Sequence, residues 1–545
     1  MNHRGIFLKQ ILSKMYEKLN TNRISGPIEA IDKFQAGSRS NRSPADQTFL
    51  LRAASDHCRY TKKAMYIVLY DFSQCFDSLW LSDCLLSLWN LGVQSETLNN
   101  IKNLNTICNI VVKTPVGMTN EAVVRSIVQQ GSVTGGILCS ASTGEVTKED
   151  LGGGCQIGDV NIKALTFVDD IATANTEVPG VRRSHNSIVW FSEKKRIPLN
   201  VPKCMIMCMY KKPTDIIPRL EIGGKVIKTV NNAVYLGDPY NNVGSNKHLV
   251  EERKKKGQAC IVSANAMCSE VTLGIFSIQT LLLLYKGLFL QVVLQNSQSW
   301  SNLSKQDLLS LKTVQMKYLK RVVHAPSSTS NVITLLETGS LPIEQEVSKR
   351  QLNFLHHVLT LDDTDPVKFT YREQLKYPYE LNWANEIKDL RTKYEILDTD
   401  EEVAQYSKES WKRCVKNKIK QHTLELLNKE MSEQKHGNKI NPYQNLQQQK
   451  YLDDLQPHEA RKVFHVRAGI LDVKCVRKYW YSDTVCRLCG QPEEDVDHIV
   501  NKCIMVPRNS QVNNVLSDEM NDMRAIAERC TLFAAKVKEM DQPGE

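Results

Sequence analysis

Two short apolar runs in the first third of the chain have the pattern of β-strands and lie next to acidic residues. Residues 65–70 read Met-Tyr-Ile-Val-Leu-Tyr, a run rich in strand-forming side chains, and Asp71 follows directly. Residues 164–172 hold Asp169 and Asp170 between two apolar stretches, which predicts two strands joined by an acidic turn. The pattern therefore predicts three carboxylates at the ends of strands.

Three carboxylates gathered in this way could hold a pair of hard divalent cations such as Mg²⁺. Two such ions, about 3.5–4 Å apart, activate an attacking oxygen and stabilise a leaving oxygen in phosphoryl transfer. Two other Asp-Asp pairs, at 362–363 and 453–454, lie in polar surroundings typical of solvated turns or helix caps. Of the three Asp-Asp pairs, only Asp169-Asp170 lies in an apolar hairpin. These two residues, together with Asp71, are therefore the expected metal ligands.

Other apolar patterns surround this acidic centre. Helical spacing predicts helices over residues 7–19 and 79–91, and residues 111–119 have the pattern of a hairpin. Residues 34–46 combine Gly, Ser and Pro with Arg39 and Arg42, which predicts a turn that presents guanidinium groups to phosphate. A solvated basic loop is the alternative for this segment.

The Gly-rich stretch from Val128 to Gly136 lets the backbone approach a ligand closely. Within it, the side chain of Gln130 can hydrogen-bond a base or a sugar, and Gly131 follows it.

The second half of the chain changes from strand to helical periodicity at about residue 246. Amphipathic stretches follow, and the basic run Arg253 to Lys256 could give the first helix a face that tracks a nucleic-acid backbone. Residues 362–402 are acidic and contain proline, which predicts a boundary or a solvated connector. Residues 432–450, rich in Gln, Asn and Lys, predict a flexible link.

Composition adds limits to this picture. The chain has 545 residues, 41% hydrophobic and 24% charged, which fits a globular protein of two to four domains. A net charge of +10 is a mild hint of a polyanionic partner. Sixteen cysteines without a secretory or transit signal favour reduced thiols, and hence a nuclear or cytoplasmic location. The longest apolar run, 280–294, is too short for a bilayer span, so no membrane partner is expected.

Near the C-terminus, Cys486, Cys489, His498 and Cys503 have the spacing C-x2-C-x8-H-x4-C. Four such ligands fit a tetrahedral structural zinc site without an open position for catalysis. Binding of one Zn²⁺ would fold a segment that is otherwise poor in core residues. Scattered reduced cysteines are the alternative.

A basic and aromatic segment precedes the cysteines. Cations for phosphates and rings for stacked bases are what binding of single-stranded or structured nucleic acid requires. The rings could equally pack beneath the metal loop. The residues concerned are Arg461, Lys462, Arg467, Lys474, Arg477, Lys478, Tyr479, Trp480 and Tyr481.

Three motifs fall in the order and spacing of polymerase motifs A, B and C. They are Tyr70 to Asp77 (YDFSQCFD), Gln130 to Ser132 (QGS) and Phe167 to Asp170 (FVDD). The chain resembles the reverse transcriptases of non-LTR (LINE-type) retrotransposons. The residues of its motifs are most similar to those of the Dong-like branch, which carries a C-terminal restriction-like endonuclease. Relative to that family we expect the chain to be truncated at both ends, with incomplete fingers and no nuclease motif after Cys503.

The resemblance implies an α+β fold, a right-hand polymerase with an antiparallel-sheet palm, a helical thumb and a C-terminal zinc knuckle. The implied divisions are partial fingers at 1–64, a palm with motifs A to E at 65–245, a thumb at 246–361, a helical connector and linker at 362–450, a basic segment and knuckle at 451–510, and a tail at 511–545.

The resemblance also implies roles for single residues. Asp71, Asp169 and Asp170 would hold two Mg²⁺ ions, and Lys203 would act as a general acid near the pyrophosphate. Arg4 would help to hold the triphosphate, with Arg39 and Arg42 as further phosphate contacts. Phe76 would crowd the sugar 2′ position, and Gln130 and Gly131 would contact the nucleotide. The family usually has Ser-Pro where this chain has Gly135-Gly136, from which we expect a looser loop.

The function implied is RNA-directed DNA polymerase activity, with an RNA template, a DNA primer or target, and deoxynucleoside triphosphates. An RNA-dependent RNA polymerase shares the three acids, but the ring of Phe76 argues against it because a ribonucleotide needs room at its 2′ position. A second rival is a nucleic-acid-binding fragment of such an element that has lost activity.

Overall fold

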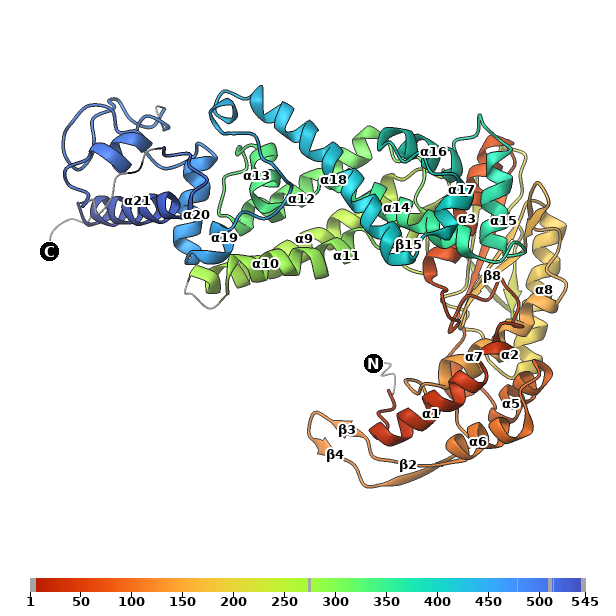
Figure 1. The fold of residues 1–545 in the computed structure, drawn as a ribbon. Helices are drawn as coiled ribbons and strands as arrows, with labels where there is room; N and C mark the ends of the chain where they lie inside the picture. The colour runs from red at the N-terminus through yellow and green to blue at the C-terminus, as the bar shows by residue number, and fades with distance from the viewer. Residues whose placement is uncertain (1–5, 273–275, 478, 508–511, 513, 541–545) are drawn as a thin grey trace.

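The computed structural model describes residues 6–272, 276–477, 479–507, 512 and 514–540 (Figure 1). Arg4 and Lys478, both singled out above, lie outside the described residues.

A five-stranded sheet forms the centre of the N-terminal half and confirms the strands predicted on both sides of the acids. The strand order is β13-β10-β1-β9-β8, and neighbouring strands are antiparallel except β10 and β13, which are parallel. The bounds are β1 (Met65–Tyr70), β8 (Ala164–Phe167), β9 (Asp170–Asn175), β10 (Met205–Met209) and β13 (Lys228–Thr229). A mixed α+β fold is therefore confirmed.

Both faces of the central strand β1 are buried, which explains its unbroken apolar sequence. Because side chains alternate along a strand, Met65, Ile67 and Leu69 enter one core together with helix α3 (Pro44–Tyr60). The intervening residues enter a second core on the other face. That core includes residues of α5 (Leu81–Asn90), α7 (Gly135–Thr143) and α8 (Val178–Lys195).

Smaller elements complete the sheet region. They are α4 (Cys75–Ser78), the 3₁₀ turn η1 (Gly144–Lys148), and the hairpin strands β6 (Cys155–Ile157), β7 (Val160–Ile162), β11 (Glu221–Ile222), β12 (Lys225–Val226), β14 (Asn232–Tyr235) and β15 (Asp238–Asn241).

An N-terminal lobe precedes and flanks the sheet. It contains α1 (Ile11–Arg23), α2 (Ser25–Ile28), α6 (Ser95–Thr106) and a ribbon of β2 (Ile107–Ile110), β3 (Lys113–Thr114), β4 (Gly117–Met118) and β5 (Ala122–Arg125), so the predicted hairpin is confirmed (Figure 1). Helix α1 is turned opposite to the usual amphipathic arrangement. Leu12 is 78% exposed, whereas Glu17 is fully buried, and its carboxylate pairs with Lys9 and accepts a hydrogen bond from the Val133 backbone N–H.

The predicted helices after residue 246 form a helical arm. In Figure 1 this arm and the N-terminal lobe extend from the sheet toward the same side. The arm comprises α9 (Lys247–Thr272), α10 (Ile278–Leu284), the π turn η2 (Tyr285–Phe289), α11 (Leu290–Val293), the 3₁₀ turn η3 (Ser297–Ser299), α12 (Lys305–Val322), α13 (Asn331–Thr338) and α14 (Ile343–Thr360).

The segment predicted as a solvated connector instead folds back onto the sheet region. Trp383 is 1% exposed, and its ring packs edge-on against Phe49 of α3 with 5.2 Å between the centroids. The predicted flexible link is also packed, because Tyr443 and Leu446 are buried. The helices here are α15 (Pro366–Leu375), α16 (Trp383–Lys393), α17 (Asp400–Gln405), α18 (Lys408–Ser432) and the short η4 (Gly437–Lys439).

The C-terminal module, residues 457–540, has its own small core. It contains α20 (Pro457–Arg467), the π turn η5 (His498–Lys502) and α21 (Met520–Met540), and the short α19 (Tyr451–Asp454) precedes it. The segment predicted as a tail forms α21, whose Ile526 and Phe533 pack in the same core as Cys486 and Cys503. Across the described residues, no helix is long and apolar enough to cross a membrane.

Candidate functional site

The strand register brings the three predicted acids to one end of the sheet. Strands β1 and β9 pair with Tyr70 opposite Ile171, so the next residues along, Asp71 and Asp170, also lie opposite each other. Strands β8 and β9 close with Phe167 opposite Asp170, which leaves Val168 and Asp169 as a two-residue turn. Asp71 and the acidic turn therefore share one edge, as the sequence predicts.

Lys203 lies on the other side of Asp71. Strand β10 pairs with β1 with Met205 opposite Leu69, and this register places Lys203 across from Asp71. The Lys203 Nζ lies 3.1 Å from Asp71 Oδ2 and 3.3 Å from Oδ1, at half-exposed positions. The lysine predicted as a general acid is thus an ion-pair partner of the first metal-ligand candidate.

The environment of Asp71 fits a ligand for a divalent cation. Its Oδ2 is shielded from solvent and accepts no hydrogen bond within the described part of the chain, although the Lys203 ammonium is close to it. Two further carboxylates lie at the same edge of the sheet. Carboxylate oxygens in this number are the donor set that Mg²⁺ prefers.

The Gly-rich loop ahead of α7 is tighter than its sequence suggests. Gly131 has φ +97°, and the Gln130 carbonyl accepts a 2.9 Å hydrogen bond from Phe7 N–H. A Cβ at Gly135 would lie 2.3 Å from the Gln129 carbonyl oxygen. The expectation of a loosened loop is therefore corrected: the glycine permits a close backbone approach that a side chain would prevent.

Phe76 lies on the short helix α4, five residues after Asp71. Its ring is half-buried and packs against the second core. The exclusion of a ribonucleotide by this ring stays a prediction.

The two arginines of loop 34–46 are engaged with protein acceptors. Arg39 donates 2.8 Å to the Glu29 carboxylate and also contacts backbone carbonyls, and Arg42 pairs with the buried Asp365. The expectation of a turn that presents both guanidinium groups to phosphate is thus not what the structure shows. A phosphate contact by Arg39 or Arg42 stays a prediction.

A buried carboxylate, Asp238, ties the β14–β15 hairpin to its surroundings, and sequence reasoning missed this role. Arg52 of α3 donates to it at 2.7 Å and Arg253 of α9 at 3.0 Å. Arg253 is fully buried, so it does not belong to the basic face expected of the run 253–256.

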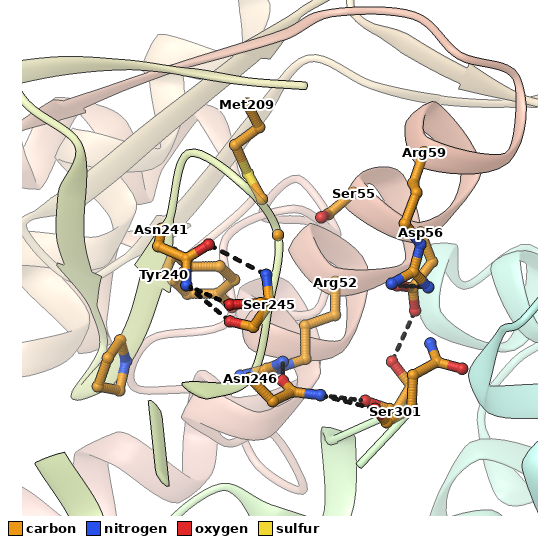
Figure 2. Close-up of a pocket in the computed structure, with 13 residues that line it drawn as sticks. Arg52, Ser55, Asp56, Arg59, Met209, Tyr240, Asn241, Ser245, Asn246 and Ser301 are labelled. Atoms are coloured by element: carbon orange, nitrogen blue, oxygen red, sulfur yellow. Dashed lines mark hydrogen bonds and ion pairs between the residues drawn. The ribbon is translucent and has the colours of Figure 1, made fainter. Parts of the chain in front are cut away.

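Figure 2 shows the polar pocket beside this junction, lined mainly by α3, β15, the loop that precedes α9 and residues 301–302. Burial raises the pKa of Asp56 there to about 6, opposed by Arg59 and by the hydrogen bond from Ser301. The pocket side chains bond mainly to one another, as the dashed lines in Figure 2 show, so we assign the pocket a structural role.

The four predicted zinc ligands come together in the C-terminal module. Their ligand atoms lie within 4.8 Å of one another, with 4.0 Å between the Cys486 and Cys503 sulfurs and 3.2 Å from Cys489 Sγ to His498 Nε2. Burial raises the pKa of Cys503 to about 12, so this thiol must release a proton to bind a cation. The cluster could hold a metal ion.

The basic and aromatic segment before the cluster divides into two parts. Arg467 is buried against Glu337 at 2.5 Å, so it anchors the module instead of facing solvent. Tyr481 packs against Arg487 with 5.4 Å from the guanidinium carbon to the ring centroid. In contrast, Tyr479 and Trp480 are exposed, and the alternative that all three rings pack beneath the metal loop is not what the structure shows.

A mainly antiparallel sheet that gathers three carboxylates at one end suits metal-dependent phosphoryl transfer. Residues 1–240 match the family model described as reverse transcriptase (RNA-dependent DNA polymerase). This part of the chain is therefore similar to reverse transcriptase domains, a family of RNA-directed DNA polymerases. No curated protein matches the chain.

Solved telomerase structures show a distant similarity. Telomerase from Candida albicans in complex with a TWJ fragment of telomeric RNA has 13% identity over 70% of this chain and 59% of that chain, with a TM-score of 0.33. The corresponding Candida tropicalis complex has 10% identity over 75% and 57%, with a TM-score of 0.34. This chain thus spans less than two thirds of those proteins.

Proposed function

We propose that this chain is the RNA-directed DNA polymerase of a non-LTR retrotransposon, which adds deoxynucleotides to a primer 3′-hydroxyl on an RNA template. The observation that carries the proposal is the strand register that brings Asp71, Asp169 and Asp170 to one edge of the sheet. The family match over residues 1–240 supports the polymerase class. The wording of the three polymerase motifs supports the non-LTR origin and the Dong-like branch, in which a DNA end serves as primer.

In this proposal Asp71, Asp169 and Asp170 hold two Mg²⁺ ions. When bound, such ions activate the primer oxygen and stabilise the leaving pyrophosphate oxygen. Lys203 is close enough to this edge to donate a proton from Nζ to the leaving group, once its ion pair with Asp71 opens. Phe76 would limit the sugar to deoxyribose through its bulk.

The C-terminal module would hold one structural Zn²⁺ at Cys486, Cys489, His498 and Cys503. The support is the complete set of four Cys and His ligand atoms, which suits Zn²⁺ in a closed tetrahedral site. The exposed rings of Tyr479 and Trp480 next to this site suit stacking on unpaired bases of the template or target. A nuclear or cytoplasmic location accords with reduced thiols in this cluster.

A second candidate function is nucleic-acid binding without turnover. The observation that favours it is the engagement of both loop arginines, because Arg39 bonds Glu29 and Arg42 pairs with Asp365. If these pairs persist when a nucleotide is present, neither guanidinium can hold the triphosphate.

Primer extension separates the two candidates. A labelled DNA primer annealed to an RNA template would be incubated with the protein, Mg²⁺ and deoxynucleotides, beside the Asp169→Ala/Asp170→Ala variant. The matched control is Asp362→Ala/Asp363→Ala, which removes an Asp-Asp pair from an exposed turn.

The proposed polymerase extends the primer, the control variant does so equally, and the variant at 169 and 170 does not. Binding of the primer–template without extension by the wild-type protein would instead support the second candidate. Extension that persists in the 169–170 variant would contradict the assigned site.

A further inference from the structure

The turn that carries Asp169 has an unusual backbone. Val168, its first residue, has φ +59°, in the left-handed region. A β-branched side chain is a marked outlier in that region, and two-residue hairpin turns with positive φ normally place Gly, Asn or Asp there. Interactions from outside the hairpin must therefore hold Val168 in this conformation.

One side chain forms hydrogen bonds with both the backbone N–H and the carbonyl oxygen of Val168. The Gln35 Oε1 accepts a 3.0 Å hydrogen bond from Val168 N–H, and its Nε2 donates 3.3 Å to the Val168 carbonyl oxygen. The same Oε1 accepts from Gly37 N–H at 2.8 Å, so two backbone donors identify this atom as the oxygen of the carboxamide. Gln35 is fully buried.

A second side chain supports the same carbonyl. The hydroxyl of Thr143, at the end of α7, lies 2.5 Å from the Val168 oxygen and accepts a 3.3 Å hydrogen bond from Gln35 Nε2. The turn is thus held from loop 34–46 and from the helix that follows the Gly-rich loop.

The backbone delivers Gln35 to this position. Residues 34–36 run parallel to β8 along the edge of the sheet, with a bridge between Gln35 and Thr166 and a 3.0 Å hydrogen bond from Ala36 N–H to the Thr166 carbonyl. A Cβ at Gly37 would lie 2.2 Å from the Val168 nitrogen, so this close approach requires glycine.

We infer that Gln35 is a positioning residue for the acidic turn: its carboxamide fixes the Val168 peptide units and thereby the direction of the Asp169 and Asp170 carboxylates. The inference rests on the proposed function, in which these carboxylates hold the catalytic cations. The Gln35 carboxamide bonds the backbone of Val168 and Gly37 and the hydroxyl of Thr143, so its effect passes through the turn.

The test is a titration of the protein with MnCl₂, followed by electron paramagnetic resonance, together with primer-extension kinetics. The variants are Gln35→Leu, which removes both hydrogen bonds to Val168, and Gln35→Glu, which keeps the accepting oxygen and loses the N–H donor. The control is Gln315→Leu, because Gln315 is a fully buried glutamine that bridges backbone groups in the helical arm.

Loss of the hydrogen bonds between Gln35 and Val168 should raise the half-saturating Mn²⁺ concentration by about tenfold, as the loss of groups that orient metal ligands commonly does. We expect kcat to fall by a similar factor while the affinity for primer–template is unchanged. Gln315→Leu should lower the melting temperature but leave the Mn²⁺ titration unchanged. Folded Gln35 variants that bind Mn²⁺ and turn over as the wild type does would overturn the inference.

Two further variants keep the test decisive if Gln35→Leu does not fold. Thr143→Val removes the hydroxyl at the Val168 carbonyl and should shift the Mn²⁺ titration in the same direction. Val168→Gly adopts a positive φ without help, so Gln35→Glu should weaken Mn²⁺ binding less in that background than in the wild type. Equal losses in both backgrounds would contradict a role through the turn.

The proposed function fails separately. A Mn²⁺ signal that persists in Asp169→Ala/Asp170→Ala would show that these acids hold no cation, whatever Gln35 does. A signal that requires the acids but ignores Gln35 would overturn the positioning role alone.

Discussion

The two groups of candidate metal-ligating side chains in this protein are built in opposite ways. The carboxylate site draws Asp71 from one strand and Asp169 and Asp170 from a hairpin about a hundred residues later. The cysteine cluster draws its four ligands from residues 486–503. The first site depends on sheet register, whereas the second depends on local turns.

This difference has consequences for stability. The carboxylate edge is held by a sheet buried on both faces, so its ligands should stay in place without a cation. The cysteine cluster lies in a core of modest size, in which Cys486 and Cys503 themselves are buried members. Metal removal should therefore stop chemistry at the first site but loosen the fold at the second.

The largest expected effect is on catalysis. Asp71→Asn keeps the side-chain shape but removes the charge that the cations require, so primer extension should fall about a thousandfold or more, ~4 kcal/mol. The melting temperature should stay within a few degrees of the wild type. Asp77→Asn is the control, because Asp77 is exposed on α4 a few residues away. An equal loss in both variants would contradict the role assigned to Asp71.

Loss of a cysteine ligand should act on folding. Cys486→Ser should lower the free energy of local unfolding of the C-terminal module by about 3 kcal/mol, because the metal proposed at this cluster would contribute to its stability. Hydrogen exchange of residues 470–540 measures this, and a chelator should reproduce it in the wild type.

Cys414→Ser is the matched control, since Cys414 lies on α18 outside the cluster. Unchanged exchange in Cys486→Ser would show that the module folds without a metal.

Substitution of Lys203 should change both turnover and cation binding at the carboxylate site. Lys203→Met removes the proposed proton donor and should slow turnover about a hundredfold, ~2.7 kcal/mol. The same change removes the ammonium 3.1 Å from Asp71, so cation binding should become tighter. Opposite shifts of kcat and of the half-saturating Mn²⁺ concentration would distinguish this role from simple disruption. Lys211→Met, an exposed lysine beyond the other end of β10, should change neither quantity.

The smallest effect concerns acid pH. Burial lowers the pKa of His465 and of His324 to about 4 each, and His465 Nε2 lies 3.1 Å from the His324 carbonyl, where α20 meets the helical arm. The unfolded histidines gain protons near pH 6.5, before the folded ones. Stability is therefore full above pH 6.5 and is lost as the pH falls toward 4, by about 1 kcal/mol per histidine between pH 7 and 5.5.

His465→Gln keeps a donor to the His324 carbonyl but does not titrate, so thermal melting of this variant should depend less on pH. His458→Gln, on the exposed side of the same helix, should melt with the pH dependence of the wild type. A wild-type protein whose stability is flat between pH 7 and 5.5 would contradict the assigned burial effect.

Local patterns in the sequence determined the strands and the two ligand sets. The apolar run before Asp71 and the apolar hairpin around Asp169 and Asp170 can be recognised by side-chain type alone, because period and burial are local properties. The four zinc-ligand candidates lie close together in the sequence, so their spacing alone predicted that their side chains would meet. The mixed fold and the helical arm follow from the change of periodicity near residue 246.

Contacts between distant segments were decided by the tertiary structure. The acidic segment 362–402 was predicted as a solvated connector, yet its Trp383 packs its buried ring against Phe49. The sequence pattern could not predict this contact, because the partner lies more than three hundred residues earlier in the chain. From the sequence, Arg253 and Arg467 were expected to be surface cations. In the structure each is buried in an ion pair, Arg253 with Asp238 and Arg467 with Glu337.

The hydrogen bonds between Gln35 and Val168 are also contacts between segments that are distant in the sequence. The sequence by itself shows a polar residue in a loop and a valine beside two acids. Only the close approach permitted at Gly37 joins them, because two hydrogen bonds across more than a hundred residues depend on how the whole sheet edge is covered.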